Sequence, residues 1–478
     1  MDFLSIKFFI FLFSALFIVY FSPLRYRISV VFPLLNLFFI LTYVNDLSQL
    51  LPLVVFLCAG FLGIRLVGTF TNRAALIASL SVILVIFIYL KKYAFISFLP
   101  FISWPYLSIG LSYILFRMVQ MLIDVYQQLI EEKVSLLSFF NFCCNFLTFV
   151  SGPIQRYEDF KLQESSLGQK ALTEREVFDS FSRMIHGFFK VVVLSTLCLN
   201  YFQWFDSFLQ SSTFNESSLV LCRKFILANF FYVLYFYFNF TGYMDIVISF
   251  GRLLGFELPE NFDRPFESRS FLEFWSRWHI TLSEWFKYYL FNPFVRFLTN
   301  KWPNRKIIAY HGVIAYFFVF FMMGVWHGSS WLFLIYGIFL GAGMSLNKLF
   351  DVLMHKYFSV QYKKMIGHRF SGLLGAAFTF SYWSIGISCF WMDFNGFVKL
   401  MAIFKIKGLL ISFLLGGFLW AAAISFVLGF KHITARTASL LFGNFYSSRI
   451  WLSFELFVVI TYWFYGFGGI PDFVYKSF

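Results

Sequence analysis

Residues 309–348 read AYHGVIAYFFVFFMMGVWHGSSWLFLIYGIFLGAGMSLNK, which is two long apolar runs separated by a short turn. A helix that crosses a membrane needs about 20 consecutive, predominantly apolar residues. Both runs approach that length, and neither contains an acidic residue. The stretch therefore predicts two membrane spans, at about 309–325 and 330–348, with Trp326, His327 and Gly328 between them.

The rest of the chain follows the same pattern. Its 478 residues are 60% hydrophobic, 24% aromatic and only 13% charged, whereas soluble globular chains carry about 25% charged residues. A water-soluble protein is excluded, and we predict an all-α polytopic membrane protein. The remaining candidate spans are 3–20, 29–43, 50–67, 75–90, 94–118, 136–150, 187–205, 219–238, 372–390, 408–430 and 450–468.

The charge balance and the cysteines exclude several classes of function. The formal net charge of +14 is typical of basic cytoplasmic loops that meet anionic lipid headgroups. We therefore expect membrane lipids as partners and no nucleic acid. The six cysteines include no CxxC pair and no histidine at zinc spacing, so neither a disulfide framework nor a metal site is indicated.

Two polar stretches, 151–186 and 257–306, interrupt the apolar pattern. Polar or irregular backbone at membrane depth is tolerated only where protein or a water-filled cavity surrounds it. These stretches therefore predict a recessed site. A third polar stretch, 351–370, is predicted to be a solvated loop whose histidines, His355 and His368, are bystanders.

Two of the seven histidines, His279 and His327, lie in aromatic and nearly uncharged surroundings. A low-dielectric pocket favours the neutral imidazole, which a general base needs. His327 fits this role best, because Gly324 and Gly328 leave bare backbone on either side of it. The alternatives are a buried histidine that donates to a backbone carbonyl, and glycines that serve only close helix packing. Helix packing is also the interpretation favoured for the GxxxG pair Gly337 and Gly341.

The residues around His279 have helical periodicity over 271–286, which predicts one interfacial helix. An aromatic belt at the membrane surface is the alternative explanation of this pattern. Two prolines upstream predict an ordered loop at 259–266 that holds Asn261 and Arg264 outside any long helix. Arg264 and Arg277 are suited to phosphate oxygens of a nucleotide-linked donor, with lipid headgroups as the alternative.

The motifs of serine hydrolases, thiol oxidoreductases, zinc proteases and P-loop enzymes are missing from the sequence. Direct transfer of an acyl group between bound substrates remains open. In that mechanism a base deprotonates an acceptor hydroxyl, which attacks a thioester carbonyl. A transporter or channel is the rival from another class, because solute pathways also use broken spans and intramembrane histidines. A catalytically silent scaffold is a third possibility.

A set of short motifs runs in order along the chain and resembles the membrane-bound O-acyltransferase (MBOAT) superfamily. The likeness is to the bacterial branch that contains the alginate O-acetylation membrane protein and the D-alanyl transfer protein of teichoic acid modification. The motifs are KY at 92–93, SIGLS at 108–112, DVY at 124–126, GPIQRY at 152–157, YFNFTGYMD at 237–245, ENF at 260–262, FWSRWH at 274–279 and WHG at 326–328.

The resemblance implies His327 as the catalytic base and His279 as a second functional position. It also implies a ring of about 10–12 transmembrane helices, with re-entrant and interfacial helices, around a central tunnel or funnel. The expected reaction moves an acetyl or other short acyl group from a cytoplasmic-side thioester donor towards a hydroxyl of an exported or cell-surface polysaccharide. The alternative is D-alanyl transfer towards teichoic acid from a carrier-protein thioester.

The resemblance further implies a bacterial cytoplasmic (inner) membrane location and no permanently bound cofactor. Acetyl-CoA or an acyl carrier protein is the expected co-substrate, and an exported SGNH-type acyltransferase is the expected partner. The chain departs from the family pattern at 336–341, where the third histidine of YGxxHG is missing, and at 287–288, where Lys-Tyr replaces Arg-Asp. Substrate-binding roles are expected for the motif residues Gln155, Arg156, Asn239, Asp245, Asn261, Trp275, Trp278, Ser283 and Trp326, together with Arg264 and Arg277.

We expect three regions along the chain. Residues 1–90 are N-terminal transmembrane helices, and residues 91–350 form the catalytic core with motif loops at 151–186 and 257–306. Residues 351–478 form a C-terminal loop and further transmembrane helices.

Overall fold

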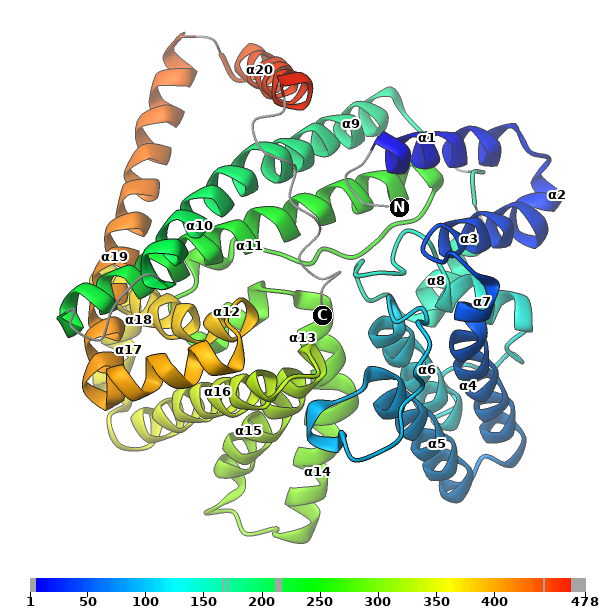
Figure 1. Ribbon diagram of the computed structural model, residues 1–478, viewed down its shortest axis with the longest axis horizontal. Coiled ribbons are helices and arrows are strands. Elements are labelled where there is room, and N and C mark those ends of the chain that lie inside the picture. The colour runs from blue at the N-terminus through cyan, green and yellow to red at the C-terminus, as the bar shows by residue number, and fades with distance from the viewer. Residues whose placement is uncertain (1–5, 166, 170–171, 211–216, 442, 466–478) are drawn as a thin grey trace. The chain divides into compact units, whose positions relative to one another are not determined.

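The computed structural model describes residues 6–165, 167–169, 172–210, 217–441 and 443–465 (Figure 1). Within these residues the protein is built from helices and contains no strand, apart from one isolated bridge between Phe262 and Trp278. Nine helices in the same part of the chain are long and apolar enough to cross a membrane, and a shorter apolar helix covers Lys7–Phe21. The prediction of an all-α polytopic membrane protein is confirmed. The central tunnel stays a prediction.

The chain divides into two compact units. Among the described residues, unit 1 comprises those of 6–187 and 243–260, and unit 2 comprises those of 188–242 and 261–465. Two helical segments, Glu174–Gln210 and α11 (Ser218–Leu254), continue from one unit into the other.

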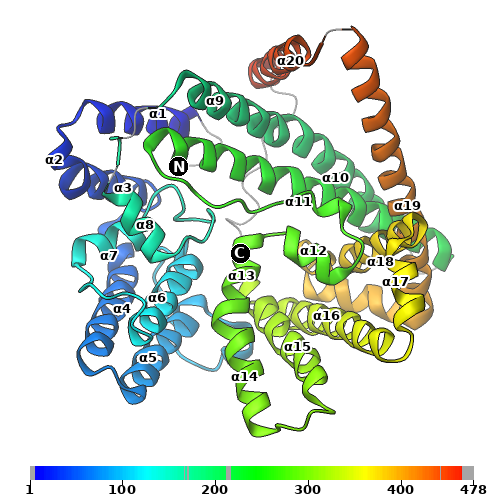
Figure 2. The same cartoon turned by 180° about the vertical axis from the view of Figure 1, so that it is seen from behind.

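Unit 1 is organised around α6, which is buried along most of its length. Helices α4, α5 and α6 pack against one another, as Figure 2 shows. The buried Arg117 guanidinium on α6 donates hydrogen bonds to the carbonyl oxygens of Phe142, Cys143 and Thr148 at 2.7–2.9 Å. The helices of this unit are α1 (Ile6–Phe21), α2 (Leu24–Tyr26), α3 (Phe32–Leu41), α4 (Leu51–Phe70), α5 (Arg73–Lys91), α6 (Leu111–Tyr126), α7 (Leu136–Cys143), α8 (Tyr157–Glu164) and α9 (Glu174–Phe188).

Two predicted spans of this unit are wrong. In the stretch 94–118, α6 begins only at Leu111, after Gly110 with φ +83°. In the stretch 136–150, α7 already ends at Cys143. The run 136–150 is mostly buried, whereas residues 97–100 and 103–105 of the first run are exposed. An apolar run therefore does not by itself establish a membrane span. Residues 3–5 of the first predicted span and 466–468 of the last lie outside the described residues.

Unit 2 contains two antiparallel helix pairs, α15 with α16 and α18 with α19 (Figures 1 and 2). Shorter helices fill the polar stretch before α15. The elements of this unit are η4 (Phe189–Ser195), α10 (Thr196–Gln210), the first part of α11, η5 (Pro265–Glu267), α12 (Phe271–Arg277), α13 (Ile280–Phe286), η6 (Lys287–Phe291), α14 (Asn292–Lys301), α15 (Ile308–His327), α16 (Trp331–Tyr357), α17 (Ser359–Gly367), α18 (Arg369–Gly386), η7 (Ile387–Phe390), α19 (Phe394–Leu441) and α20 (Gly443–Tyr465).

The predicted solvated loop at 351–370 is instead mostly helical, because α16 continues to Tyr357 and α17 follows at Ser359. Asp351 accepts hydrogen bonds from Lys348 at 2.9 Å and from Tyr362 at 3.1 Å. Spacings of three and four residues bring side chains together on a helix. The charges that suggested a loop therefore stabilise the end of α16 and its contact with α17.

Glycines determine how closely α15 and α16 approach. A Cβ atom added to Gly324 would overlap the backbone of Gly337, and one added to Gly337 would lie 2.6 Å from the carbonyl oxygen of Phe321. At Gly328 the ring of Phe333 occupies the space that a side chain would need. The packing interpretation of these glycines is confirmed, and it accounts for the bare backbone on both sides of His327.

Gly324→Ala is expected to reduce the thermal stability of the detergent-purified protein, because forcing atoms into a close-packed contact costs about 1–3 kcal/mol. Gly429→Ala is the matched control, since a Cβ added to this exposed glycine of α19 meets no atom within 4 Å. Thermal unfolding of both variants in the same detergent tests the prediction. Equal melting temperatures would contradict the close contact.

Candidate active site

His327 is the last residue of α15 and is only 4% exposed. Its Nδ1 lies 2.7 Å from the carbonyl oxygen of Met323, one turn earlier in the helix. A carbonyl oxygen only accepts hydrogen bonds, so Nδ1 is the donor and carries the proton. In the neutral imidazole the lone pair is then on Nε2. This is the tautomer in which Nε2 accepts a proton from a hydroxyl group.

His279 lies at a break between two short helices, since α12 ends at Arg277 and α13 begins at Ile280. Its backbone is left-handed, with φ +45°, a conformation that is strained by about 1–3 kcal/mol in a residue with a side chain. The single helix predicted over 271–286 is therefore wrong. The upstream loop causes the break, because Ile280 N donates to the carbonyl of Asn261 and Asp263 N donates to that of Arg277, each at 3.0 Å.

The fully buried Asn261 holds His279 in place. Its Oδ1 accepts hydrogen bonds from His279 Nδ1 at 3.1 Å, from Thr281 N at 3.1 Å and from Thr281 Oγ1 at 2.9 Å. Because a backbone N–H only donates, the atom that faces it is the amide oxygen. His279 therefore also carries its proton on Nδ1. Burial lowers the pKa of His279 well below its ordinary value, and the nearby His327 lowers it further.

Aromatic rings connect the two imidazoles. Phe240 contacts His279 with ring centroids 5.0 Å apart, and Phe390 contacts His327 at 5.6 Å. Phe236 on α11 joins these rings, at 6.3 Å from Phe240 and 5.6 Å from Phe390. The two histidines thus belong to one aromatic cluster of unit 2. Such surroundings have a low dielectric constant, which favours uncharged imidazoles.

A cavity of about 210 Å³ in unit 2 is lined by residues close to both histidines in sequence, although neither histidine is itself a lining residue. Ile280, which follows His279, and Met323, which binds His327, both line it. Its buried walls are apolar, and the exposed side chains of Ser276, Glu284 and Lys287 lie at its rim. Two of the predicted binding residues, Trp275 and Ser283, also line this cavity.

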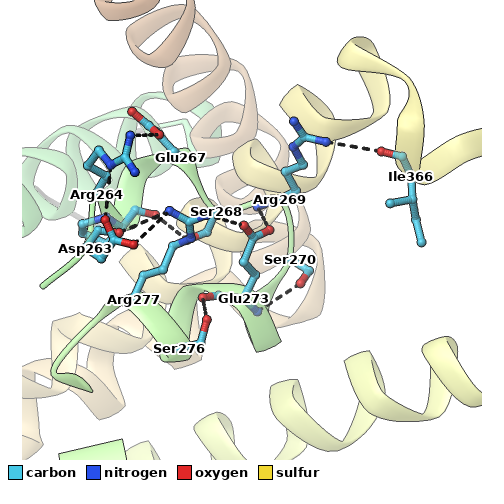
Figure 3. A network of polar contacts seen from close by, with 11 residues as sticks. Asp263, Arg264, Glu267, Ser268, Arg269, Ser270, Glu273, Ser276, Arg277 and Ile366 are labelled. Carbon is cyan, nitrogen blue, oxygen red and sulfur yellow. Dashed lines mark hydrogen bonds and ion pairs between the residues drawn. The ribbon is translucent and has the colours of Figure 1, made fainter. Parts of the chain in front are cut away.

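The predicted phosphate-binding residues Arg264 and Arg277 belong to a charged network in unit 2 (Figure 3). Arg277 pairs with Glu273 at 3.0 Å and with Asp263 at 3.7 Å. Arg264 pairs with Asp263 at 3.2 Å and with Glu267 at 3.6 Å. A phosphate would therefore compete with carboxylates for both guanidinium groups, and their role in binding it stays a prediction.

The other predicted binding residues fall into two groups. Asn239, Trp278 and Trp326 are buried in unit 2 with the histidines, and the Trp326 ring lies 4.9 Å from that of His327. The remaining three, Gln155, Arg156 and Asp245, lie in unit 1.

The contacts of two of these unit 1 residues are defined. Gln155 donates to Gln163 at 3.0 Å, and Asp245 accepts from Arg183 Nε at 2.9 Å. The same Arg183 guanidinium holds Glu260 through two hydrogen bonds of 2.6 Å. Asp245 therefore takes part in an ion-pair network, and a binding role for it stays a prediction.

Sequence reasoning missed three contributors to the site. Thr281 shares Asn261 with His279, and Met323 fixes the tautomer of His327. The roles of Thr281 and Met323 could have been predicted from the sequence. Thr281 follows His279 by two residues, and a helix brings the carbonyl of the residue four positions earlier within reach of a side chain. Phe390 lies far from both histidines in sequence, and no local pattern identifies it.

The stability of the protein is expected to decrease in acid partly because of His279. Its pKa in the folded state is lowered, so the unfolded state binds the proton first as the pH falls. This contribution to stability is therefore complete above about pH 6.5, the ordinary histidine pKa, and decreases below it. His279→Asn removes the titrating group, and asparagine tolerates the left-handed backbone. Melting temperatures measured from about pH 7.5 to about pH 5 should fall more steeply for the wild type; parallel curves would contradict this prediction.

Two buried imidazoles in one aromatic cluster of a multi-pass membrane protein are suited to proton transfer away from bulk water. The sequence model of MBOAT, the membrane-bound O-acyltransferase family, matches residues 70–390. The chain belongs to this family and is by class an O-acyltransferase.

Curated relatives carry two names. The teichoic acid D-alanyltransferase of Bacillus subtilis is 31% identical over 308 residues, which cover 60% of this chain and 73% of that protein. The protein of the same name from Streptococcus thermophilus is 32% identical, over 50% of this chain and 56% of its own length. The probable alginate O-acetylase of Pseudomonas syringae pv. tomato is 29% identical, over 54% of this chain and 46% of its own length. The chain thus matches about half the length of the latter two proteins.

Proposed function

We propose that the protein transfers an acetyl or other short acyl group from a thioester donor on the cytoplasmic side towards a hydroxyl of an exported or cell-surface polysaccharide. We place it in a bacterial cytoplasmic membrane, in line with its bacterial relatives. The observation that carries the proposal is the hydrogen bond from His327 Nδ1 to Met323 O. It supports a neutral imidazole with its lone pair on Nε2, which is the form that a general base requires.

In the proposed reaction, His327 Nε2 takes the proton of the acceptor hydroxyl. The oxygen attacks the thioester carbonyl carbon, and a new C–O bond forms. The C–S bond then breaks, and the thiolate leaves with the proton that the imidazolium returns. No bond to the enzyme forms, so the protein contributes orientation and proton transfer. Both increase the reaction rate by large factors when the reactants are held in place.

We assign His279 a supporting role. Asn261 and the adjoining backbone fix its ring in one orientation, and burial favours its neutral form. A neutral ring places no second positive charge beside His327 when that residue becomes an imidazolium. Arg264 and Arg277 are candidates for the donor's phosphate groups, provided that these displace the paired carboxylates.

D-alanyl transfer towards teichoic acid, with a carrier-protein thioester as donor, is the second candidate. The names of the relatives from Bacillus subtilis and Streptococcus thermophilus favour it. Both candidates use the same base and the same bond changes, so they differ only in acyl group, donor and acceptor. In either case an exported SGNH-type acyltransferase is a candidate partner for completing the transfer.

The test uses the purified protein in proteoliposomes. Labelled acetyl-CoA, acetyl carrier protein and D-alanyl carrier protein are supplied in turn on one side, with candidate polysaccharides on the other. Label bound covalently to a polysaccharide supports the proposal and identifies the donor. Accumulation of an unmodified solute without covalent transfer would instead favour a transporter.

A further inference from the structure

The segment that joins α14 to α15 carries a concentrated positive charge. Residues 296–308, here called the basic segment, contain four cations and no acidic residue, and the cations are Arg296, Lys301, Arg305 and Lys306. All four side chains are exposed, and none pairs with a carboxylate among the described residues. A surface with charges of a single sign attracts partners of the opposite sign.

The basic segment has a defined place in unit 2, because α14 packs against α15 (Figures 1 and 2). The rings of Phe294 on α14 and Phe318 on α15 have centroids 4.7 Å apart. Thr299 Oγ1 lies 3.2 Å from His311 Nδ1, which joins the same two helices further along. One face of α14 is thus occupied by α15, and its exposed cations lie on the other face.

Large apolar side chains are exposed among these cations. Phe297 is 54% exposed, Trp302 is 46% exposed and Ile307 is 39% exposed. Ile314 and Phe317 on α15 follow Ile307 by seven and ten residues, so they share its side of the helix, and both are exposed as well. Because α15 is long and apolar enough to cross a membrane, this exposed stripe faces lipid. The basic segment therefore lies where a lipid-facing surface reaches the membrane interface, and tryptophan is enriched at that level.

The distribution of charge along α15 indicates the side of the membrane. The chain contains no Lys, Arg, Asp or Glu between Ile307 and Asn347. Cations therefore lie at the amino end of α15 and are missing from its carboxyl end and from the turn at 328–330. Lys and Arg are concentrated at the cytoplasmic ends of membrane spans. By this rule the basic segment is cytoplasmic, on the leaflet whose surface is negatively charged.

We infer that the basic segment binds the headgroups of anionic phospholipids. Its guanidinium and ammonium groups donate to the phosphate oxygens, and the exposed aromatic rings lie at the boundary with the acyl chains. The Lys301 ammonium already lies 4.9 Å from the Trp302 ring centroid and 5.7 Å from that of Phe297. Continuity with the lipid-facing stripe of α15 favours a lipid over a soluble acidic protein as the partner. The inference is independent of the acyl group and the acceptor.

The test uses the full chain in a non-ionic detergent. Native mass spectrometry measures the Kd of the most tightly bound lipid, with either phosphatidylglycerol, which is anionic, or phosphatidylcholine of the same chain length. We expect the wild type to bind phosphatidylglycerol more tightly. In the variant Lys301→Gln/Arg305→Gln/Lys306→Gln, the Kd for phosphatidylglycerol should rise by about fivefold for each cation removed, and the Kd for phosphatidylcholine should stay within about twofold of the wild type.

The matched control is Arg73→Gln/Arg175→Gln/Lys399→Gln, which removes the same charge from exposed residues of three different helices. This control should keep the wild-type preference for phosphatidylglycerol. A basic-segment variant that also keeps the preference would overturn the inference. So would an acidic soluble protein that binds the wild type but not this variant, if neither form distinguishes the two lipids.

Discussion

Replacing His327 with alanine is expected to reduce acyl transfer by about 10²- to 10⁴-fold, the usual contribution of a positioned general base. The variant lacks the only atom to which the proposed reaction assigns the hydroxyl proton, and the Met323 carbonyl loses its donor. Label transferred to the acceptor, measured with wild type and variant in identical proteoliposomes, tests this expectation. His327→Gln is a useful companion, because it retains a side-chain donor of comparable reach but has no basic nitrogen.

His355→Ala is the control for this experiment. His355 belongs to the same hairpin, at the far end of α16, and its exposed ring contacts Asp351. Its replacement is expected to leave turnover within about twofold of the wild type, as is usual for exposed residues outside a site. Wild-type turnover by a folded His327→Ala variant would remove the proposed base.

Replacing Asn261 with alanine is expected to destabilise the protein by about 3 kcal/mol or more. Three buried donors, one on His279 and two on Thr281, would lose their acceptor, and an unsatisfied buried donor costs about 1–3 kcal/mol. Acyl transfer should fall as well, because the His279 ring loses its fixed orientation. Thermal unfolding and turnover, measured on the same preparation, report the two effects together.

Two further variants define the role of Asn261. Asn304→Ala removes an exposed acceptor, bound only to the nearby Lys306 N–H among the described residues, and should change stability by less than about 0.5 kcal/mol. Asn261→Asp keeps an acceptor oxygen but places a negative charge beside His279, which raises the pKa of that histidine. As the pH is lowered, the turnover of this variant should therefore begin to decline at a higher pH than the turnover of the wild type does. An Asn261→Ala variant as stable as the wild type would contradict the role of the amide oxygen.

Sequence patterns predicted the elements that depend on local composition. The two runs around His327 became α15 and α16, and the prolines at 259 and 265 correctly placed Asn261 in an ordered loop. The spans predicted at 94–118 and 136–150 were wrong, because apolar composition alone does not distinguish a long helix from turns and short helices. The helix predicted over 271–286 was wrong because hydrogen bonds from a distant loop outweigh its regular periodicity.

In the candidate site, too, the features that depend on local sequence were predicted, and those that depend on contacts between distant segments were not. His279 and His327 were selected because an ionisable ring in apolar sequence needs an explanation, and the structure places both in one aromatic cluster. The pairing of Asn261 with Thr281 and the position of Phe390 depend on contacts between segments far apart in the chain. The cavity near Met323 depends on how α12, α13, η6, α15 and α16 pack, and no short window of sequence contains that information.

The position of His327 at the carboxyl end of α15 favours this ring as the one that holds the proton in the proposed reaction. The aligned peptide dipoles of a helix give its last turn a partial negative charge, which favours a nearby cation by about 0.3–1 kcal/mol. His279 immediately precedes the first residue of α13, where the corresponding partial charge is positive. In the proposed reaction, these partial charges favour keeping the abstracted proton on His327 until the departing sulfur takes it, and no proton relay through the second histidine is required.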